Sequence, residues 1–165
     1  MANRYFKPLI VFIVVFLMSD CLNAGRPQVS GGKAVNFTLR DINNNQYTLS
    51  DYKGRKNVLL FFWMTRCPYC VKDILMLDNM YAELLKNDFE LLSIDVGESA
   101  RRINNFFRNR KPTFIILLDE DGSVAESYEL LGVPTYVLID KQGNEVFKGN
   151  SFPHSEYKRL ISEAK

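Results

Sequence analysis

Apolar residues follow two different patterns along the chain, short continuous runs and helical periodicity. Residues 58–63 (VLLFFW) and 89–96 (FELLSIDV) are almost continuously apolar, as expected of central strands that are buried on both faces. Other short apolar runs between turn residues predict strands at 37–39, 47–49, 114–118, 136–140 and 145–149. These runs predict one sheet with a buried centre.

Helical spacing separates these runs. Between residues 68 and about 86, apolar side chains recur every three to four positions, so one face of a helix is expected to lie on the sheet. Similar patterns predict helices at 99–110, 124–131 and 154–163. The fold class is therefore α/β: a central mixed sheet flanked by helices, with an N-terminal β-hairpin and an antiparallel strand pair at the C-terminal end.

The composition fits one domain, predicted at residues 33–165. The chain has 165 residues, of which 47% are hydrophobic, enough for one full core. A net charge of +2 is spread along the sequence without a basic run, so no nucleic acid is expected as a partner.

The first 24 residues have the order of a secretory signal. Arg4 and Lys7 precede ten apolar residues (9–18), and small residues follow at Ala24 and Gly25. This run is shorter than the roughly 20 residues that span a bilayer, which favours a cleaved signal over a permanent N-terminal anchor. Residues 25–32 then form a short linker. We expect an extracytoplasmic protein, in the periplasm or on the outer face of the cytoplasmic membrane.

Cys21 leaves a second possibility for this segment. A cysteine just after such an apolar run is where bacterial lipoproteins are acylated, but Asp20 occupies a position that should be small. Cleavage after Ala24 would remove Cys21 and leave the mature chain with one cysteine pair.

That pair, Cys67 and Cys70, is the main candidate for chemistry. A zinc site needs four ligands, and the chain has no second pair and only one histidine. A structural disulfide across two residues would constrain the unfolded chain very little. A redox-active dithiol has a physical cause, because Cys67 is predicted at the cap of the helix and Pro68 at its first residue, where the helix end stabilises a thiolate. Cys67 would attack, and Cys70 would resolve the mixed disulfide.

Four other residues are candidates for roles near the cysteines. Arg66 either adds positive charge beside Cys67 or is an ordinary surface arginine. Asp73, three residues after Cys70, either exchanges a proton with Cys70 or complements the helix dipole. Pro134 fits a cis peptide bond or a simple turn. His154 is predicted to have a capping or surface role and is left out of the site.

The order of these motifs resembles a known family. The motif W-x-x-x-C-x-x-C, which begins at Trp63, ends a buried strand, and Val133-Pro134-Thr135 precedes another strand. Together they resemble the thioredoxin superfamily. The N-terminal hairpin, an inserted strand–helix segment with SIDVGES and the ending GVPTYVLIDKQGNEV are similar to its TlpA/ResA group, with an AhpC/TSA-type redoxin domain.

The resemblance implies a thiol-disulfide oxidoreductase. It implies that Cys67 forms the mixed disulfide, that Cys70 resolves it, and that a cis Val133–Pro134 bond faces the dithiol and contacts the substrate backbone. It places supporting carboxylates at Asp73 and Glu98. Expected substrates are exported proteins with disulfides, apocytochrome c among them, and the expected electron donor is a membrane thiol-disulfide transporter. We expect a monomer that needs no metal or organic cofactor.

The sequence departs from the group at three positions. Arg66 replaces the usual tryptophan before the first cysteine, Asp73 is shorter than the usual glutamate, and Phe61 replaces the acidic residue that thioredoxins bury two places before the tryptophan. Three alternative functions stay open: a disulfide-forming oxidase, a peroxiredoxin-type peroxidase whose T-x-x-C context is not matched here, and a copper-binding module using Cys67, Cys70 and His154.

Overall fold

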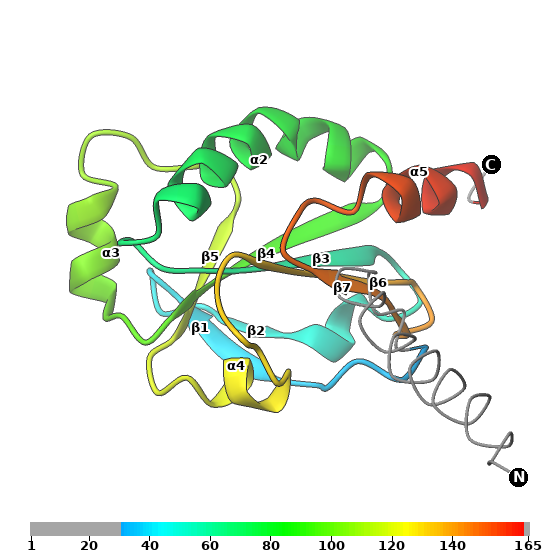
Figure 1. Cartoon of the computed structure of the whole chain (residues 1–165), viewed down its shortest axis with the longest axis horizontal. Helices are drawn as coiled ribbons and strands as arrows, with labels where there is room; N and C mark the ends of the chain where they lie inside the picture. The colour runs from blue at the N-terminus through cyan, green and yellow to red at the C-terminus, as the bar shows by residue number, and fades with distance from the viewer. Residues whose placement is uncertain (1–30, 164–165) are drawn as a thin grey trace, which may run out of the picture.

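Seven strands form one mixed sheet in the order β2-β1-β5-β4-β3-β6-β7 in the computed structural model, which describes residues 31–163 (Figure 1). The strands are β1 Thr38–Asp41, β2 Gln46–Thr48, β3 Asn57–Trp63, β4 Phe89–Val96, β5 Ile115–Asp119, β6 Thr135–Ile139 and β7 Glu145–Gly149. The helices are η2 Leu49–Tyr52, α2 Pro68–Lys86, α3 Ala100–Phe106, α4 Ser123–Ser127 and α5 His154–Glu163.

The centre of the sheet is parallel and its two edges are antiparallel. Strands β3, β4 and β5 pair in parallel, and α2 and α3 make the two crossovers between them. On one side β6 and β7 continue the sheet antiparallel to β3, and on the other side the β1–β2 hairpin pairs with β5. The predicted α/β class and both terminal hairpins are therefore confirmed.

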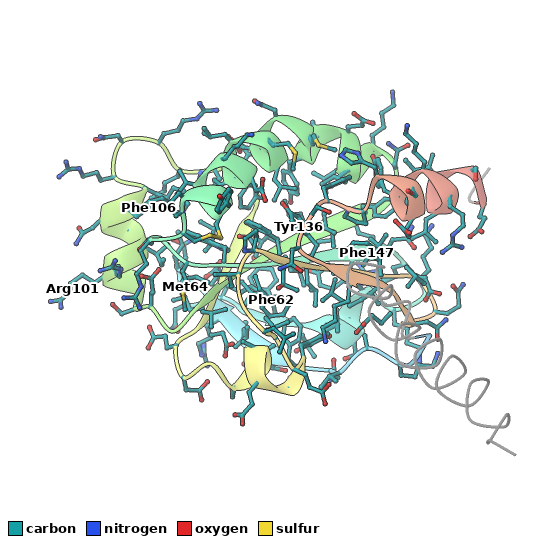
Figure 2. All side chains as sticks on the ribbon, in the orientation of Figure 1. Phe62, Met64, Arg101, Phe106, Tyr136 and Phe147 are labelled. Carbon is teal, nitrogen blue, oxygen red and sulfur yellow. A yellow bond between two sulfur atoms is a disulfide. The ribbon has the colours of Figure 1, made fainter. Side chains whose placement is uncertain are left out.

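Alternating residues of the central strands fill two core layers. From β3, Leu59, Phe61 and Trp63 pack with residues of α2, α3 and α5, whereas Val58, Leu60 and Phe62 pack with α4 and η2. Figure 2 shows Phe62 and Tyr136 on opposite sides of the sheet. A strand covered on both faces has no polar face, which explains why the sequence of β3 is apolar at nearly every position.

Helix α2 begins and ends where the sequence predicts. Cys67 is its N-cap in an extended conformation and Pro68 is its first residue, where a missing N–H costs no helical hydrogen bond. After Lys86 the chain leaves the helix through Asn87 and then Asp88, which has a positive φ of 59°. The cap and first turn of α2, which contain both cysteines, therefore follow closely after the end of β3 at Trp63.

Two predicted helices were too long. The segment predicted at 99–110 is helical only from Ala100 to Phe106, because the chain then turns toward Lys111, which precedes Pro112 and is biased away from helical backbone. After this turn, Thr113 donates hydrogen bonds from both its backbone N–H and its hydroxyl to the carboxylate of Asp78.

The segment predicted at 124–131 is helical only over Ser123–Ser127. Glu129 has a positive φ of 51°, and the N–H of Leu130 donates to the carbonyl of Ala125, which closes the helix in a Schellman motif. The predicted strands agree with the observed ones to within two residues.

The predicted signal segment at residues 1–24 and most of the linker at 25–32 lie outside the described residues. Between residues 31 and 163 no helix is long and apolar enough to cross a membrane.

Candidate active site

Cys67 and Cys70 are joined by a disulfide at the start of α2. Their Cα atoms are 5.2 Å apart, and the backbone N–H of Cys70 donates to Sγ of Cys67 at 3.1 Å. The sulfur of Cys67 thus occupies the N-cap acceptor position, where the N–H groups of the helix end stabilise negative charge on a reduced sulfur. Cys70 is fully buried and Cys67 is half-buried. Cys67 is therefore the cysteine that an incoming substrate can reach.

A cis peptide bond between Val133 and Pro134 faces this disulfide. The carbonyl oxygen of Val133 lies 3.8 Å from Sγ of Cys67. The hydroxyl of Thr135, the first residue of β6, donates to the carbonyl of Gly132 at 2.7 Å and holds the turn. The cis bond that the resemblance implies is confirmed, and the loop lies beside Cys67.

A groove of about 540 Å³ runs beside the cysteines. Residues of α2, of the cis-proline loop and of the segment between β7 and α5 line it: Tyr69, Asp73, Met76, Val133, Pro134, Asn150, Ser151, Phe152 and His154. The imidazole of His154 lies 4.8 Å from the ring of Phe152. His154 is exposed at the first residue of α5, which agrees with the surface role predicted for it, and its side chain forms part of the groove wall.

Asp73 does not stand free beside the cysteines. Its Oδ2 accepts a 2.8 Å hydrogen bond from the hydroxyl of Tyr136, a residue that the sequence interpretation did not single out. Burial, helped by this carboxylate, raises the pKa of Tyr136 above its usual value of 10. Tyr136 therefore remains a hydrogen-bond donor at every physiological pH, and the pair joins β6 to α2.

Glu98 anchors the loop that leads into Cys67. Its carboxylate accepts hydrogen bonds from the backbone N–H of Thr65 at 2.7 Å and from the Thr65 hydroxyl at 2.8 Å, and it forms an ion pair with Arg102. Burial would raise the pKa of Glu98, but these hydrogen bonds outweigh it and hold the pKa below its usual value. Glu98 thus acts on the position of the loop two residues before Cys67.

Trp63 and Asp95 lie side by side below this loop. Trp63 is fully buried against Phe106 and Phe107, with ring centroids at 5.9 and 5.7 Å. Asp95, its neighbour on β4, is fully buried as well. Burial first, and the adjacent Glu98 second, raise the pKa of Asp95 to about 8. The sequence interpretation missed Asp95, whose burial follows from the packing of α3 over the end of β4.

The surface around Cys67 is apolar and basic. Leu131, in the cis-proline loop, is completely exposed and Tyr69 is 76% exposed. Arg66 is exposed too, and its guanidinium has no hydrogen bond or ion pair within residues 31–163. No group of three or more His, Cys, Asp and Glu side chains in the described part of the chain is arranged so that it could hold a metal ion.

Comparisons with known proteins agree with this geometry. The AhpC/TSA family matches residues 30–145. A thiol-disulfide oxidoreductase ResA of Bacillus subtilis is 32% identical over 84% of this chain and 77% of its own length.

Two solved structures resemble the fold. The thioredoxin domain of a thiol-disulfide oxidoreductase from Bacteroides vulgatus has a TM-score of 0.70 and 25% identity, covering 79% of this chain and 96% of its own. The exposed lipoprotein thioredoxin Etrx1 of Streptococcus pneumoniae has a TM-score of 0.68 and 26% identity, covering 78% of this chain and 99% of its own.

Proposed function

Because the chain belongs to the AhpC/TSA family and is a thiol-disulfide oxidoreductase, we propose that it reduces disulfides in proteins outside the cytoplasm through Cys67 and Cys70. One observation carries the proposal: the half-buried Cys67 lies beside the cis-proline loop, with its Sγ 3.8 Å from the carbonyl oxygen of Val133, while Cys70 is fully buried. An exposed attacking sulfur and a shielded resolving sulfur are what exchange with a protein substrate requires.

The reaction proceeds in two exchange steps. The thiolate of reduced Cys67 attacks one sulfur of the substrate disulfide, forms a mixed disulfide and releases the other substrate sulfur as a thiolate. Cys70 then loses its proton and attacks Sγ of Cys67, which restores the Cys67–Cys70 disulfide and frees the second substrate sulfur. Two electrons pass to the substrate, so a thiol-disulfide donor must reduce the protein again. We assign that role to a membrane transporter.

The substrate groove suits an extended polypeptide. The carbonyl group of Val133 beside Cys67 is a backbone acceptor with which a peptide chain would pair, and the exposed Tyr69 in the groove wall and Leu131 two residues before Val133 would add apolar contacts. Apocytochrome c, whose haem-binding cysteines must be reduced before attachment, is the substrate we propose to test first.

Export is supported by two facts. The N-terminal segment has the order of a secretory signal, and one similar structure is described as an exposed lipoprotein. Alkaline phosphatase, which folds only after export, provides a test when fused behind residue 30. Activity of the fusion in intact bacteria supports an extracytoplasmic site, and an inactive fusion contradicts it.

The reduction potential of the Cys67–Cys70 pair tests the direction of the reaction. Equilibration in glutathione and dithiothreitol buffers should give a value near or below about −220 mV, as for a reductant. A value near about −120 mV would belong to an oxidant that installs disulfides, and would overturn the proposal. Reduction of oxidised apocytochrome c by the dithiol form, with the Cys67→Ser variant as control, then tests the substrate.

A further inference from the structure

Asp95 is a buried carboxyl group that the exchange steps above do not use. Its exposed fraction is 0%, no donor among residues 31–163 lies within hydrogen-bond distance of its oxygens, and Glu98 is the residue whose side chain and backbone N–H approach them. By the alternation of β4, it points to the same side of the sheet as Phe89 and Leu91, the side covered by α2 and α3. Burial of an unpartnered carboxylate is costly, so such a group normally has a reason to be there.

The groups that face Asp95 explain where its proton resides. Glu98, in the loop after β4, and Arg102, on α3, are the charged groups beside it, and its neighbours on β3 and β5 are Trp63 and Leu118, which do not titrate. Glu98 stays ionised because it accepts hydrogen bonds from Thr65 and Arg102. Asp95 and Glu98 together therefore bind one proton, and this proton resides on Asp95, whose pKa is raised to about 8.

The same pair is connected to the cysteines through the backbone. Glu98 accepts both the N–H and the hydroxyl of Thr65, and only Arg66 separates Thr65 from Cys67. Arg102 also donates to the Thr65 hydroxyl at 3.0 Å, so loop, Glu98 and α3 form one network. A charge that appears at Asp95 therefore acts directly on the anchor of the loop that presents Cys67.

We propose that Asp95 is a positioning residue for thiol-disulfide exchange: its proton keeps the Glu98–Thr65 anchor closed, and loss of that proton lowers the reactivity of Cys67. With Asp95 neutral, Glu98 is the single negative charge of the pair and holds the loop. With Asp95 ionised, two buried carboxylates repel each other, and the added negative charge below the loop opposes a thiolate at Cys67. The inference rests on exchange at the dithiol and is independent of which protein is the substrate.

Trp63 provides a direct readout. It is the single tryptophan of the chain, and in the β3–β4 register it is the partner of Asp95. Trp63 fluorescence in the oxidised full-length protein should show one transition between pH 6 and 9.5, and Asp95→Asn should abolish it. Asn has nearly the shape of the protonated acid, so this variant is expected to fold at pH 7. A flat titration of the unmodified protein, or an unchanged transition in Asp95→Asn, would overturn the proposal.

Reactivity is measured on the reduced protein with iodoacetamide, with mass mapping to assign the label to Cys67. Asp95→Asn and the unmodified protein should react alike at pH 6.5, and the variant should react about three- to ten-fold faster at pH 9.5. A merely structural role would slow or destabilise the variant at both pH values without changing the shape of its pH profile, and that result counts against the proposal.

Asp88→Asn is the matched control. Asp88 precedes the other end of β4, is 62% exposed, and has a positive φ that asparagine adopts readily. Its pH profile of iodoacetamide reactivity should follow that of the unmodified protein.

If Asp95→Asn does not fold, the Trp63 transition of the unmodified protein still tests the proposal. The midpoint of this transition should be higher by about half a pH unit in the reduced form, because the Cys67 thiolate disfavours a second charge nearby. Equal midpoints in both forms would contradict the coupling. None of these measurements needs a protein substrate, so their failure is distinct from failure of the proposed function.

Discussion

The hydroxyl of Tyr136 donates a 2.8 Å hydrogen bond to Oδ2 of Asp73, and this contact ties the cis-proline strand β6 to the helix that carries the cysteines. Both residues stand next to the groove, Asp73 in its wall and Tyr136 buried behind it. The Asp73 carboxylate therefore accepts a hydrogen bond from a hydroxyl group that does not ionise at physiological pH. Proton exchange between Asp73 and Cys70 would have to occur beside this hydrogen bond.

The first prediction concerns this pair. Tyr136→Phe removes a donor to a charged group and should lower the free energy of unfolding by about 2 kcal/mol, measured by urea unfolding. Asp73→Asn keeps an acceptor for Tyr136 and should cost less stability, while it shifts the pH dependence of exchange if Asp73 handles the proton of Cys70. An unchanged pH profile in a stably folded Asp73→Asn protein would return Asp73 to the role of complementing the helix dipole.

The second prediction separates the two cysteines. Cys67→Ser should abolish exchange, because the reachable sulfur is lost, whereas Cys70→Ser should accumulate a mixed disulfide through Cys67, visible by mass spectrometry without reductant. Full activity of Cys67→Ser, or a mixed disulfide trapped through Cys70 instead, would reverse the assigned roles.

The third prediction concerns the loop anchor. Glu98→Ala leaves the N–H of Thr65 and the guanidinium of Arg102 without their carboxylate, so we expect a loss of about 2–3 kcal/mol in the free energy of unfolding and slower exchange at pH 7. Glu126→Ala, an exposed position on α4 across the sheet, is the control and should change neither. Equal effects of the two substitutions would remove Glu98 from the anchor.

The long buried elements could be predicted because their patterns leave little choice. An apolar run such as β3 has to be covered on both faces, and a proline directly after a cysteine marks the first turn of α2. The cysteine pair is a local motif, whereas the cis Val133–Pro134 bond was implied only by the family resemblance, because the residues alone also fit a simple turn.

The parts that sequence could not give depend on contacts between distant segments. Tyr136 and Asp73 are 63 residues apart, and Thr65 and Glu98 are 33 apart. Asp95 reads as one more residue of a strand, and only the packing of α3 shows that its carboxyl is buried beside Glu98. Helix ends such as that of α4 were missed because a non-glycine residue, Glu129, takes the left-handed conformation there.

The fourth prediction tests recognition by the exposed rim. Leu131→Ser should raise the KM for a protein disulfide by about ten-fold or more, since a leucine buried on binding contributes about 1.5–3 kcal/mol. Reduction of a small disulfide such as oxidised glutathione should be unchanged. Leu85→Ser, at the far end of α2 and also exposed, is the control for a general loss of apolar surface. A matching rise in KM for the small disulfide would mean that Leu131 acts on the cysteines and not on the substrate chain.

The last prediction follows from the buried acid. The pKa of Asp95 is about 8 in the folded protein, against 3.8 for an ordinary aspartate, so between these values the folded state holds a proton that the unfolded state has lost. The contribution of this proton to the free energy of unfolding is fully present below about pH 4. As the pH rises, it falls by about 1.4 kcal/mol per pH unit until Asp95 ionises in the folded protein.

Carboxylates with a lowered pKa, such as Asp41, Asp78 and Glu98, act in the opposite direction, but their contribution is lost only below about pH 5. Urea unfolding of the oxidised protein between pH 5 and 8 therefore isolates Asp95. The unmodified protein should lose stability steadily across this range, and Asp95→Asn should lose much less, because asparagine carries no proton to release. Parallel lines for the two proteins would mean that Asp95 is already ionised in the folded protein at pH 5.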